Sequence, residues 1–288
     1  MSQLSDYAEN KLTDMIRGQA WTLGASLYLG LASAASDSAV TELSGTGYGR
    51  VGVTRSLANW AGTQGAGTTA ASSGTSHGSS NNVAINFGTA GTAWGTANYV
   101  VVYDAASAGN AVCYLPLATA LVVGVGVVAP IAIGALSFTL GLTGGGSDYT
   151  ANKLLDFIFR GQAFTFPATL YAGLFTAAPS NAGGGTEVGG GVGYARVSIT
   201  GSLANWAGTQ AAASTVASTG TGGQTSNNAA ITFGTPTGSW GSVGWVGFYD
   251  AASTGNLIFW AALAAVKTVT SGAAPPSFAA AAQTITWA

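Results

Sequence analysis

The nine residues Ser56-Leu-Ala-Asn-Trp-Ala-Gly-Thr-Gln64 recur without change from Ser202 to Gln210. Further residues repeat at the same offset: Tyr48 and Tyr194, Arg50 and Arg196, Ser80-Asn81-Asn82 and Ser226-Asn227-Asn228, Trp94 and Trp240, and Asp104 and Asp250. Self-similarity at a fixed offset is the signature of a tandem repeat. The repeat predicts two similar units, residues 1–143 and 147–288. The boundary is expected near Gly144-Gly145-Gly146, because a run of glycines has no side chain to pack.

The length and composition are consistent with two globular units. A prior of one domain per roughly 150 residues gives about two domains for a chain of 288 residues. Hydrophobic residues make up 48% of the chain, which is too apolar for a disordered protein. The formal net charge is −2, so the chain has no cationic surface to neutralise a row of phosphates. Nucleic acid is therefore not expected as a partner.

Each unit is predicted to begin with a short α-helix. Apolar residues follow helical spacing at the amino terminus: Leu4, Ala8, Leu12, Met15 and Ile16. Asp6, with Glu9 three residues later, is expected to cap this helix, and Gly18 is expected to end it. The corresponding helix of the second unit is predicted from Asp148 to Arg160.

Short β-favouring runs follow each helix and are separated by Gly, Ser, Thr, Asn and Pro. They are Leu27–Leu31 with Leu170–Phe175, Val83–Phe87 with Ala229–Phe233, Tyr99–Tyr103 with Trp245–Tyr249, and Leu257–Leu263. Many short strands with no further helices between them are typical of antiparallel architectures. The predicted fold is therefore mainly β, with two tandem antiparallel β-sandwich or jelly-roll-like domains, each preceded by a short helix.

An uncharged stretch covers residues 111–142, yet it does not predict a membrane span. Pro116 and Pro130, together with several glycines, divide it into pieces of strand length. The equivalent stretch of the second unit contains Lys267. The first residues also lack a basic start followed by an apolar stretch, so no secretory signal is expected.

Motifs that would indicate an enzyme are weak. Gly74-Thr-Ser-His-Gly78 fits the pattern of a nucleophile elbow, but no apolar strand precedes it and no helix follows it. The only histidine, His77, is next to Ser76, whereas the base of a triad approaches from elsewhere in the fold. The second unit has Gly220-Thr-Gly-Gly-Gln224 at this place. The sequence therefore predicts a surface loop and no enzyme.

Cofactor and metal sites are not expected either. Gly124-Val-Gly-Val-Val-Ala129 imitates a dinucleotide fingerprint, but Pro130 follows at once and no acidic residue appears before Asp148. One His and one Cys, Cys113, cannot complete the ligands of a zinc site. Asp104 and its counterpart Asp250 each precede a Gly-Asn pair and are interpreted as turn residues.

Most of the few charged residues are repeated between the two units, which points to a need in the shared fold or in assembly. The seven pairs are Asp6/Asp148, Lys11/Lys153, Asp14/Asp156, Arg17/Arg160, Glu42/Glu187, Arg50/Arg196 and Asp104/Asp250. Glu42 with Arg50, and Glu187 with Arg196, are candidates for structural ion pairs that tie a loop to a strand. The alternative is that these are solvated charges. The charges on the helices have an ordinary explanation in capping and in spaced ion pairs.

Two pairs of tryptophans are candidates for packing, an interface or ligand binding: Trp60 with Trp206, and Trp94 with Trp240. An indole face stacks well on the apolar side of a sugar. Packing is the preferred interpretation, because small residues next to these tryptophans allow close approach of the backbone.

The second unit resembles a family of small tailed-bacteriophage virion proteins, usually described as tail-fibre or tail proteins. The resemblance rests on Ser147-Asp-Tyr-Thr-Ala-Asn-Lys-Leu-Leu-Asp156, Leu170-Tyr-Ala-Gly-Leu-Phe-Thr-Ala-Ala-Pro179 and Phe248-Tyr-Asp-Ala-Ala-Ser-Thr-Gly-Asn-Leu-Ile-Phe-Trp260, among other blocks. It extends more faintly to the first unit. Members usually have one such unit, so the tandem arrangement departs from the family, and the resemblance implies no catalytic residues.

These observations predict a non-enzymatic structural component of a tailed-phage virion, without a cofactor. A tail-fibre or tail-associated position is preferred over head decoration or a collar. The expected partners are other virion proteins and further copies of the chain in a symmetric oligomer, because apolar patches are buried between repeated copies. Three chains would supply six units for a six-fold ring, or would form a trimeric fibre. The alternative is a carbohydrate- or host-receptor-binding module that uses the tryptophans and the asparagines at Asn81-Asn82 and Asn227-Asn228.

Overall fold

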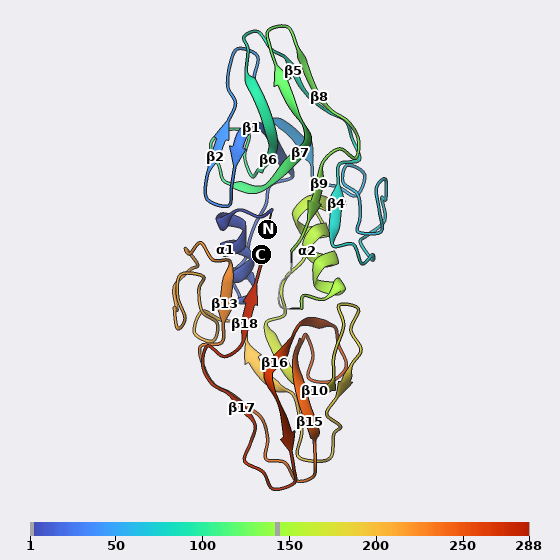
Figure 1. Ribbon diagram of the computed structural model, residues 1–288, viewed down its shortest axis with the longest axis vertical. Helices are drawn as coiled ribbons and strands as arrows, with labels where there is room; N and C mark the ends of the chain where they lie inside the picture. The colour runs from blue at the N-terminus through green and yellow to red at the C-terminus, as the bar shows by residue number, and fades with distance from the viewer. Residues whose placement is uncertain (1–2, 142–144, 288) are drawn as a thin grey trace.

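The computed structural model describes residues 3–141 and 145–287. Two helices lie in the middle of an elongated molecule, and β-sheets form its two ends (Figure 1). The helices are α1 (Asp6–Ile16) and α2 (Asp148–Arg160). Part of the predicted boundary, at Gly144, lies outside the described residues.

Serines, and not the predicted Asp6, cap the two helices. Ser5 has an extended backbone, and its Oγ accepts a hydrogen bond from the Ala8 N–H at 3.2 Å. Ser147 does the same with the Thr150 N–H at 3.1 Å. A short side-chain oxygen at the N-cap satisfies a helix N–H that has no partner inside the helix. The prediction of the cap was therefore wrong by one residue.

The first half is organised around a five-stranded antiparallel sheet. Its strands are β1 (Ser26–Ala35), β2 (Val40–Glu42), β3 (Val51–Thr54), β6 (Gly95–Tyr103) and β7 (Ala111–Val123). The long strand β1 pairs with β6 on one side. On its other side it pairs with β3 along its first residues and with β2 along its last.

The second half contains the same sheet in the same order. Its strands are β10 (Thr169–Ala177), β11 (Thr186–Glu187), β12 (Val197–Thr200), β15 (Gly241–Tyr249) and β16 (Leu257–Val269). Register is preserved, since Tyr28 lies opposite Tyr103 in the first sheet and Tyr171 lies opposite Tyr249 in the second. The prediction of a mainly β protein with two similar antiparallel parts is confirmed.

Each half adds two small two-stranded sheets. In the first half, β4 (Gly78–Ser80) pairs with β9 (Ser137–Thr139), and β5 (Ile85–Thr89) pairs with β8 (Val128–Ile131). In the second half, β13 (Gln224–Ser226) pairs with β18 (Thr284–Thr286), and β14 (Ile231–Thr232) pairs with β17 (Ser277–Phe278). Within the described residues none of the sheets closes into a barrel.

The uncharged stretch from residue 111 onward forms the three strands β7, β8 and β9, as its prolines and glycines indicate. Gly126, which has a positive φ of 76°, lies in the turn between β7 and β8. The stretch that imitates a dinucleotide fingerprint is therefore a turn that links β7, which pairs with β6, to β8, which pairs with β5. No helix among the described residues has the length and apolarity that a bilayer crossing requires.

A common hydrophobic core joins the two halves. Leu27, Leu29 and Leu31 alternate along β1 and are fully buried on the face that packs inward. The core continues without interruption into the second half, where Trp21 packs on Phe157 with 5.6 Å between the ring centroids. The largest core cluster is therefore shared by the two halves, and each half has in addition a small cluster of its own, around Tyr103 in the first and Tyr249 in the second.

Each helix contacts both halves of the chain. The helix α1 packs on β7 of its own half and on β13 of the other half, and α2 packs on β16 of its own half and on β4 of the other. Figure 1 shows α1 beside β13 and β18, and α2 beside β4 and β9. The helices thus cross between the halves in a reciprocal arrangement.

Candidate assembly site: two crossed helices

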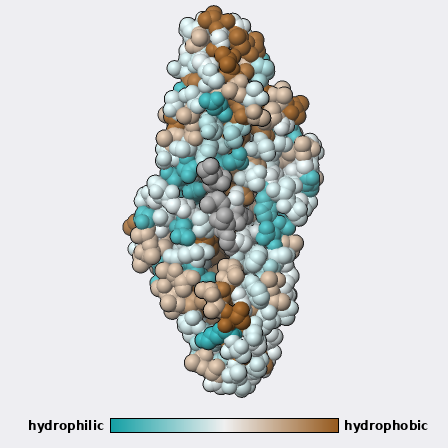
Figure 2. Space-filling view, viewed as in Figure 1, coloured by the Kyte–Doolittle hydropathy of each residue, from teal (hydrophilic) through white to brown (hydrophobic). Residues whose placement is uncertain are grey.

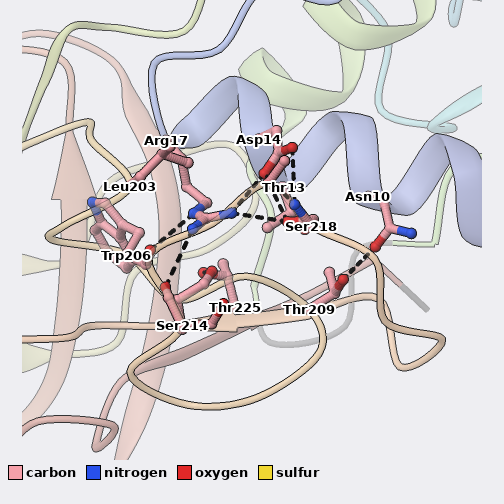
Figure 3. A network of polar contacts seen from close by, with 12 residues as sticks. Asn10, Thr13, Asp14, Arg17, Leu203, Trp206, Thr209, Ser214, Ser218 and Thr225 are labelled. Carbon is pink, nitrogen blue, oxygen red and sulfur yellow. Dashed lines mark hydrogen bonds and ion pairs between the residues drawn. The ribbon is translucent and has the colours of Figure 1, made fainter.

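One face of α1 carries three polar side chains that contact the second half of the chain. Asn10, Asp14 and Arg17 are three or four residues apart and therefore lie on the same side of the helix. Figure 3 shows them directed at the loop that follows Trp206. We call the surface of the second half that receives α1, formed by residues 206–218, β13 and β18, the second docking site.

Arg17 is the central residue of this contact, and it is fully buried. Its Nε donates to the carbonyl oxygen of Trp206 at 2.9 Å, and its Nη2 donates to the carbonyl oxygen of Ser214 at 3.2 Å. Its Nη1 donates to Asp14 Oδ1 at 2.7 Å and to Ser218 Oγ at 3.1 Å. A buried charge is tolerated when it is both paired and hydrogen-bonded, and Arg17 meets both conditions.

Asp14 and Asn10 complete the contact (Figure 3). The Asp14 carboxylate accepts hydrogen bonds from the backbone N–H of Ser218 at 3.1 Å and from its Oγ at 2.7 Å. Asn10 Oδ1 accepts a hydrogen bond from the hydroxyl of Thr209, and Asn10 Nδ2 donates to the Gly220 carbonyl at 3.1 Å. Donors and acceptors on the two sides therefore match.

The helix α2 makes the same contacts with the first half. Arg160 is also fully buried, and its Nε donates to the Trp60 carbonyl at 3.0 Å. Its Nη1 donates to Asp156 Oδ1 at 2.6 Å and to Ser72 Oγ at 3.0 Å. Its Nη2 donates to the Ala70 carbonyl at 2.6 Å. We call this surface, formed by residues 60–72, β4 and β9, the first docking site.

The remaining contacts of α2 follow the same scheme. The Asp156 carboxylate accepts from the N–H of Ser72 at 2.9 Å and from its Oγ at 2.6 Å, and Asn152 Oδ1 accepts from the hydroxyl of Thr63. The halves therefore contact each other through two copies of one interface. An interface in which each side supplies an equivalent helix and an equivalent receiving surface resembles an isologous one, so the two sides are related by an approximate two-fold symmetry.

The four tryptophans proposed as packing, interface or ligand residues are all buried. Trp60 and Trp206 are exposed by 1% and 0%, so their ring faces have no room for a sugar. Trp60 packs on Phe159 of α2 with 4.9 Å between centroids. Trp94 and Trp240 are exposed by 4% each. They donate from Nε1 to the backbone carbonyls of Thr46 and Val192.

Glu42 and Arg50 lie together in the first half. Arg50 Nη2 is 2.7 Å from Glu42 Oε2, and Tyr48 donates its hydroxyl proton to Glu42 Oε1 at 2.8 Å. The guanidinium also covers the ring of Tyr103 at 3.3 Å from its centroid, and donates to the Ala105 carbonyl at 3.0 Å. The cluster thereby joins the sheet edge at β2 to the turn that follows β6.

The second half repeats this cluster. Arg196 Nη2 is 2.7 Å from Glu187 Oε2, Tyr194 donates to Glu187 Oε1 at 2.7 Å, and the Arg196 guanidinium lies 3.5 Å from the centroid of the Tyr249 ring. These residues are part of each half and do not contribute to the joint between the halves.

The electrostatics of the Glu42 cluster follow from burial and hydrogen bonding. Burial by itself raises the pKa of Glu42, but the hydrogen bonds from Arg50 and Tyr48 and the positive charge of Arg50 outweigh it, and the pKa lies below its ordinary value. Burial, followed by the nearby Glu42 charge, raises the pKa of Tyr103 to about 12. Glu42 is thus held ionised and Tyr103 protonated, as the hydrogen bonds require.

The motif at Ser76 and His77 does not assemble a catalytic constellation. The Ser76 hydroxyl donates to the Thr63 carbonyl at 2.6 Å. His77 Nε2 instead lies 2.6 Å from Asp148 Oδ1, at the beginning of α2. The two side chains therefore serve different structural contacts. Among the described residues no group of three or more His, Cys, Asp or Glu residues could hold a metal ion.

The other predicted polar residues have structural contacts. Asp104 accepts from the Asn110 N–H at 2.7 Å, and Asp250 accepts from the Asn256 N–H at 2.6 Å, which confirms the interpretation as turn residues. Asn81 donates from Nδ2 to the carbonyls of Val83 and Ala132 and is fully buried. It is therefore not displayed at a loop tip as a binding group.

Reasoning from the sequence missed the residues that receive the helices. Thr63, Ser72, Thr209 and Ser218 are hydroxyl residues in Gly- and Ser-rich loops, a composition that also describes an exposed loop. The available signals were the unchanged nine-residue repeat and the retention of the Asp and Arg pairs on both helices. These signals indicate that both units need the same residues, but they do not indicate which half each helix contacts.

Comparison with known proteins bears on both halves. A family model described as Podophage GP4 fiber I protein gp80 matches residues 3–139 and, a second time, residues 145–286. No curated protein matches the chain.

Proposed function

Because the chain belongs to the family described as Podophage GP4 fiber I protein gp80, and is therefore a virion-located structural fibre protein of a bacteriophage, we propose that it acts as a non-enzymatic building element of a tail fibre. The family is represented twice in the chain, and the two crossed helices join both representatives. In this proposal the joint fixes the two units as one elongated body.

The observation that carries the proposal is the reciprocal burial of Arg17 and Arg160. Each guanidinium spans from one half to the other and is fully enclosed by backbone carbonyls, a carboxylate and a serine hydroxyl. Such a contact resists separation of the halves, because removal of either side leaves a buried charge without partners. A fibre element needs this kind of fixed geometry, whereas a catalytic site needs accessible reactive groups.

The two-fold joint affects how an oligomer is built. Neighbouring subunits of a six-fold ring contact each other through two different surfaces, whereas the two units here use the same surface on both sides. The units of one chain therefore do not fit adjacent equivalent positions of a six-fold ring. We propose instead that whole chains are the repeating element, and that they associate with further copies and with other virion proteins.

The first half carries a surface suited to association with a second copy. Val122, Val125 and Val127 are exposed by 68%, 70% and 38% at its outer end, where Figure 2 shows a strongly apolar area. The equivalent positions of the second half are Thr268, Ser271 and Ala273. No charged residue lies between Asp104 and Asp148, so the valine-bearing ends of two copies meet without charge repulsion.

Glycan or receptor binding, the alternative from the sequence, would have to use surfaces other than the tryptophans. Trp60 and Trp206 lie at the start of the two receiving loops, and their rings are buried. We therefore retain the structural role as the proposal for this chain.

Imaging of labelled virions tests the proposed position. A peptide tag inserted between Gly189 and Gly190, which are exposed and have open space around them, would be labelled with an antibody. Label on fibres that project from the tail is the expected result. Label confined to the head surface or the collar would contradict the tail position, and particles without label would contradict the role in the virion.

A further inference from the structure

The two docking sites share their polar contacts but differ in how they fit a helix. We propose that the second docking site accepts α1 and rejects α2, and that the first docking site accepts α2 and rejects α1. A first half then pairs with a second half, in its own chain or in another copy, and not with its like. This inference deepens the proposed structural role, since it assigns the residues that decide which units join.

The first difference concerns one pair of buried side chains, which is polar at the second docking site and apolar at the first. Trp287 Nε1 donates to Thr13 Oγ1 at 2.9 Å, and both side chains are fully buried. Trp287 and Leu140 are equivalent, because their N–H groups donate to the carbonyls of Gly223 and His77, which are equivalent residues. Thr13 corresponds to Leu155, since these residues precede Asp14 and Asp156. The first site therefore has two leucines, both buried.

This pair penalises the wrong combination. If α2 entered the second docking site, Leu155 would face the Trp287 indole, and a buried N–H donor would lose its partner. If α1 entered the first docking site, the Thr13 hydroxyl would face Leu140, and it would exchange the indole for a bond to a carbonyl of its own helix. A buried polar group without a hydrogen bond is costly, whereas a correct polar pair or a correct apolar pair is not.

The second difference lies where each helix ends. Asp14 and Arg17 are three residues apart, but Asp156 and Arg160 are four apart, so α2 is longer by one residue before its arginine. Arg55 of the first half donates from Nε to the Ile158 carbonyl at 2.9 Å, and from Nη2 to the Phe157 carbonyl, at this end. The longer helix thus has an arginine that satisfies its last carbonyls.

The second half has Gly201 where the first half has Arg55, and α1 approaches it closely. A Cβ atom at Gly201 would lie 2.6 Å from the Ile16 carbonyl oxygen, a backbone atom that cannot move aside. The end of α1 therefore needs a glycine opposite to it. The arginine that fits the end of α2 has no room against α1.

The third difference is found near the beginning of each helix. A Cβ atom at Gly223 would lie 2.4 Å from Glu9 Oε2, so the long side chain belongs to α1 and the receiving residue is a glycine. In the first half the position equivalent to Gly223 is His77, whose side chain pairs with Asp148, and the helix residue equivalent to Glu9 is Ala151. The larger residue of this pair of positions is therefore on the helix at the second docking site and on the receiving half at the first. Specificity of this kind arises from features that disfavour the wrong partner.

Pairing of cut chains tests the proposal. A protease site replacing residues 142–144 of the full chain would be cleaved after folding, and the halves would be unfolded in urea, refolded together and weighed by native mass spectrometry. We expect unlike pairs to exceed like pairs by about tenfold or more, the factor that one unpaired buried donor can carry. A random distribution of like and unlike pairs would overturn the proposal.

A double-mutant cycle in the uncut chain provides a second test that does not require refolding of separate halves. Thr13→Leu alone and Trp287→Leu alone should each lower the urea midpoint. The double variant recreates the leucine pair of the first site and should recover part of the loss. Strictly additive losses would overturn the proposal.

The same double variant makes a further prediction for the cut chains. Its second docking site now offers a leucine, so Leu155 fits there and pairs of two second halves should become detectable. Arg50→Ala is the control, because it disturbs the first half away from the joint and should leave the preference for unlike pairs unchanged. An unchanged preference in the double variant would contradict the assignment. The pairing experiment uses purified protein, whereas the proposed tail position is tested by labelling virions. Random pairing would therefore overturn this inference without touching the proposed function, and absence of label from virions would overturn the proposed function without touching the pairing.

Discussion

Arg17 donates from Nε to the carbonyl oxygen of Trp206 at 2.9 Å, across 189 positions of the sequence. The corresponding bond runs in the opposite direction from Arg160 to Trp60 at 3.0 Å. The tandem units are therefore crossed and do not sit side by side as independent domains. Each unit packs its helix on the other, so we expect the stability of either half to depend on its neighbour.

Truncation of either arginine should destabilise the whole chain. Arg17→Ala leaves the Asp14 carboxylate buried without its cation, and loss of one partner of a buried ion pair costs about 3–5 kcal/mol. Urea unfolding followed by circular dichroism measures the loss, and Arg160→Ala should give a similar value. Arg17→Lys retains the charge without the planar fork, so its stability should lie between that of the unchanged protein and that of Arg17→Ala. A loss in Arg17→Ala no larger than that of an exposed substitution would contradict the described burial.

Stability should fall in acid because of Glu42. Its pKa is lowered in the folded protein, so the ionised cluster stabilises the fold above the ordinary value of 4.5, and this contribution disappears as the pH falls through the lower folded value. The urea midpoint should decrease as the pH is lowered from 7 to below 4.5. Glu42→Gln should be less stable at neutral pH and should show a smaller decrease. An identical pH dependence in both proteins would contradict the role of Glu42.

Cys113 should be unreactive in the folded protein. It is fully buried beside the first residues of the chain, and burial raises the pKa of its thiol, which disfavours the thiolate that reacts. A colorimetric thiol reagent at pH 8 should label the native protein only as fast as the protein unfolds. Addition of urea should give complete labelling of this single cysteine. Rapid labelling without denaturant would contradict the burial.

Self-association should depend on the apolar end of the first half. Val125→Asp combined with Val127→Asp places charges in this area and should shift the mass found by light scattering towards a single chain. Ser271→Asp combined with Ala273→Asp, at the equivalent positions of the second half, is the matched control and should not change the mass. Equal effects of both changes would show that the valines have no special part in association.

The sequence predicts more of the local structure than of the joint. The helix at Asp148–Arg160 and the strand runs around Leu27 and Trp245 were expected, because their apolar spacing depends on short-range geometry. The cap at Ser5 was missed, since Asp6 is an equally suitable capping residue by type. The antiparallel sheets followed from the number and the spacing of strands.

The crossing of the helices could not be predicted for a physical reason. The receiving residues Thr63 and Thr209 lie in copies of the same nine-residue sequence, so an uncrossed arrangement would offer Asn10 the same polar groups. The choice depends on the few positions where the copies differ, such as Trp287 and Leu140. Such a difference indicates which helix a site receives only when the helix residue that contacts it is known.

Disulfide trapping tests the crossing most directly. In a Cys113→Ser background, Asn10→Cys with Thr209→Cys should form a disulfide on mild oxidation, because the two native side chains are hydrogen-bonded. After cleavage at residues 142–144, the oxidised protein should migrate as one covalently joined species without reducing agent and as two halves with it. Asn10→Cys with Thr63→Cys, the pair for an uncrossed helix, should remain reduced. Efficient trapping of the second pair instead of the first would contradict the crossed arrangement.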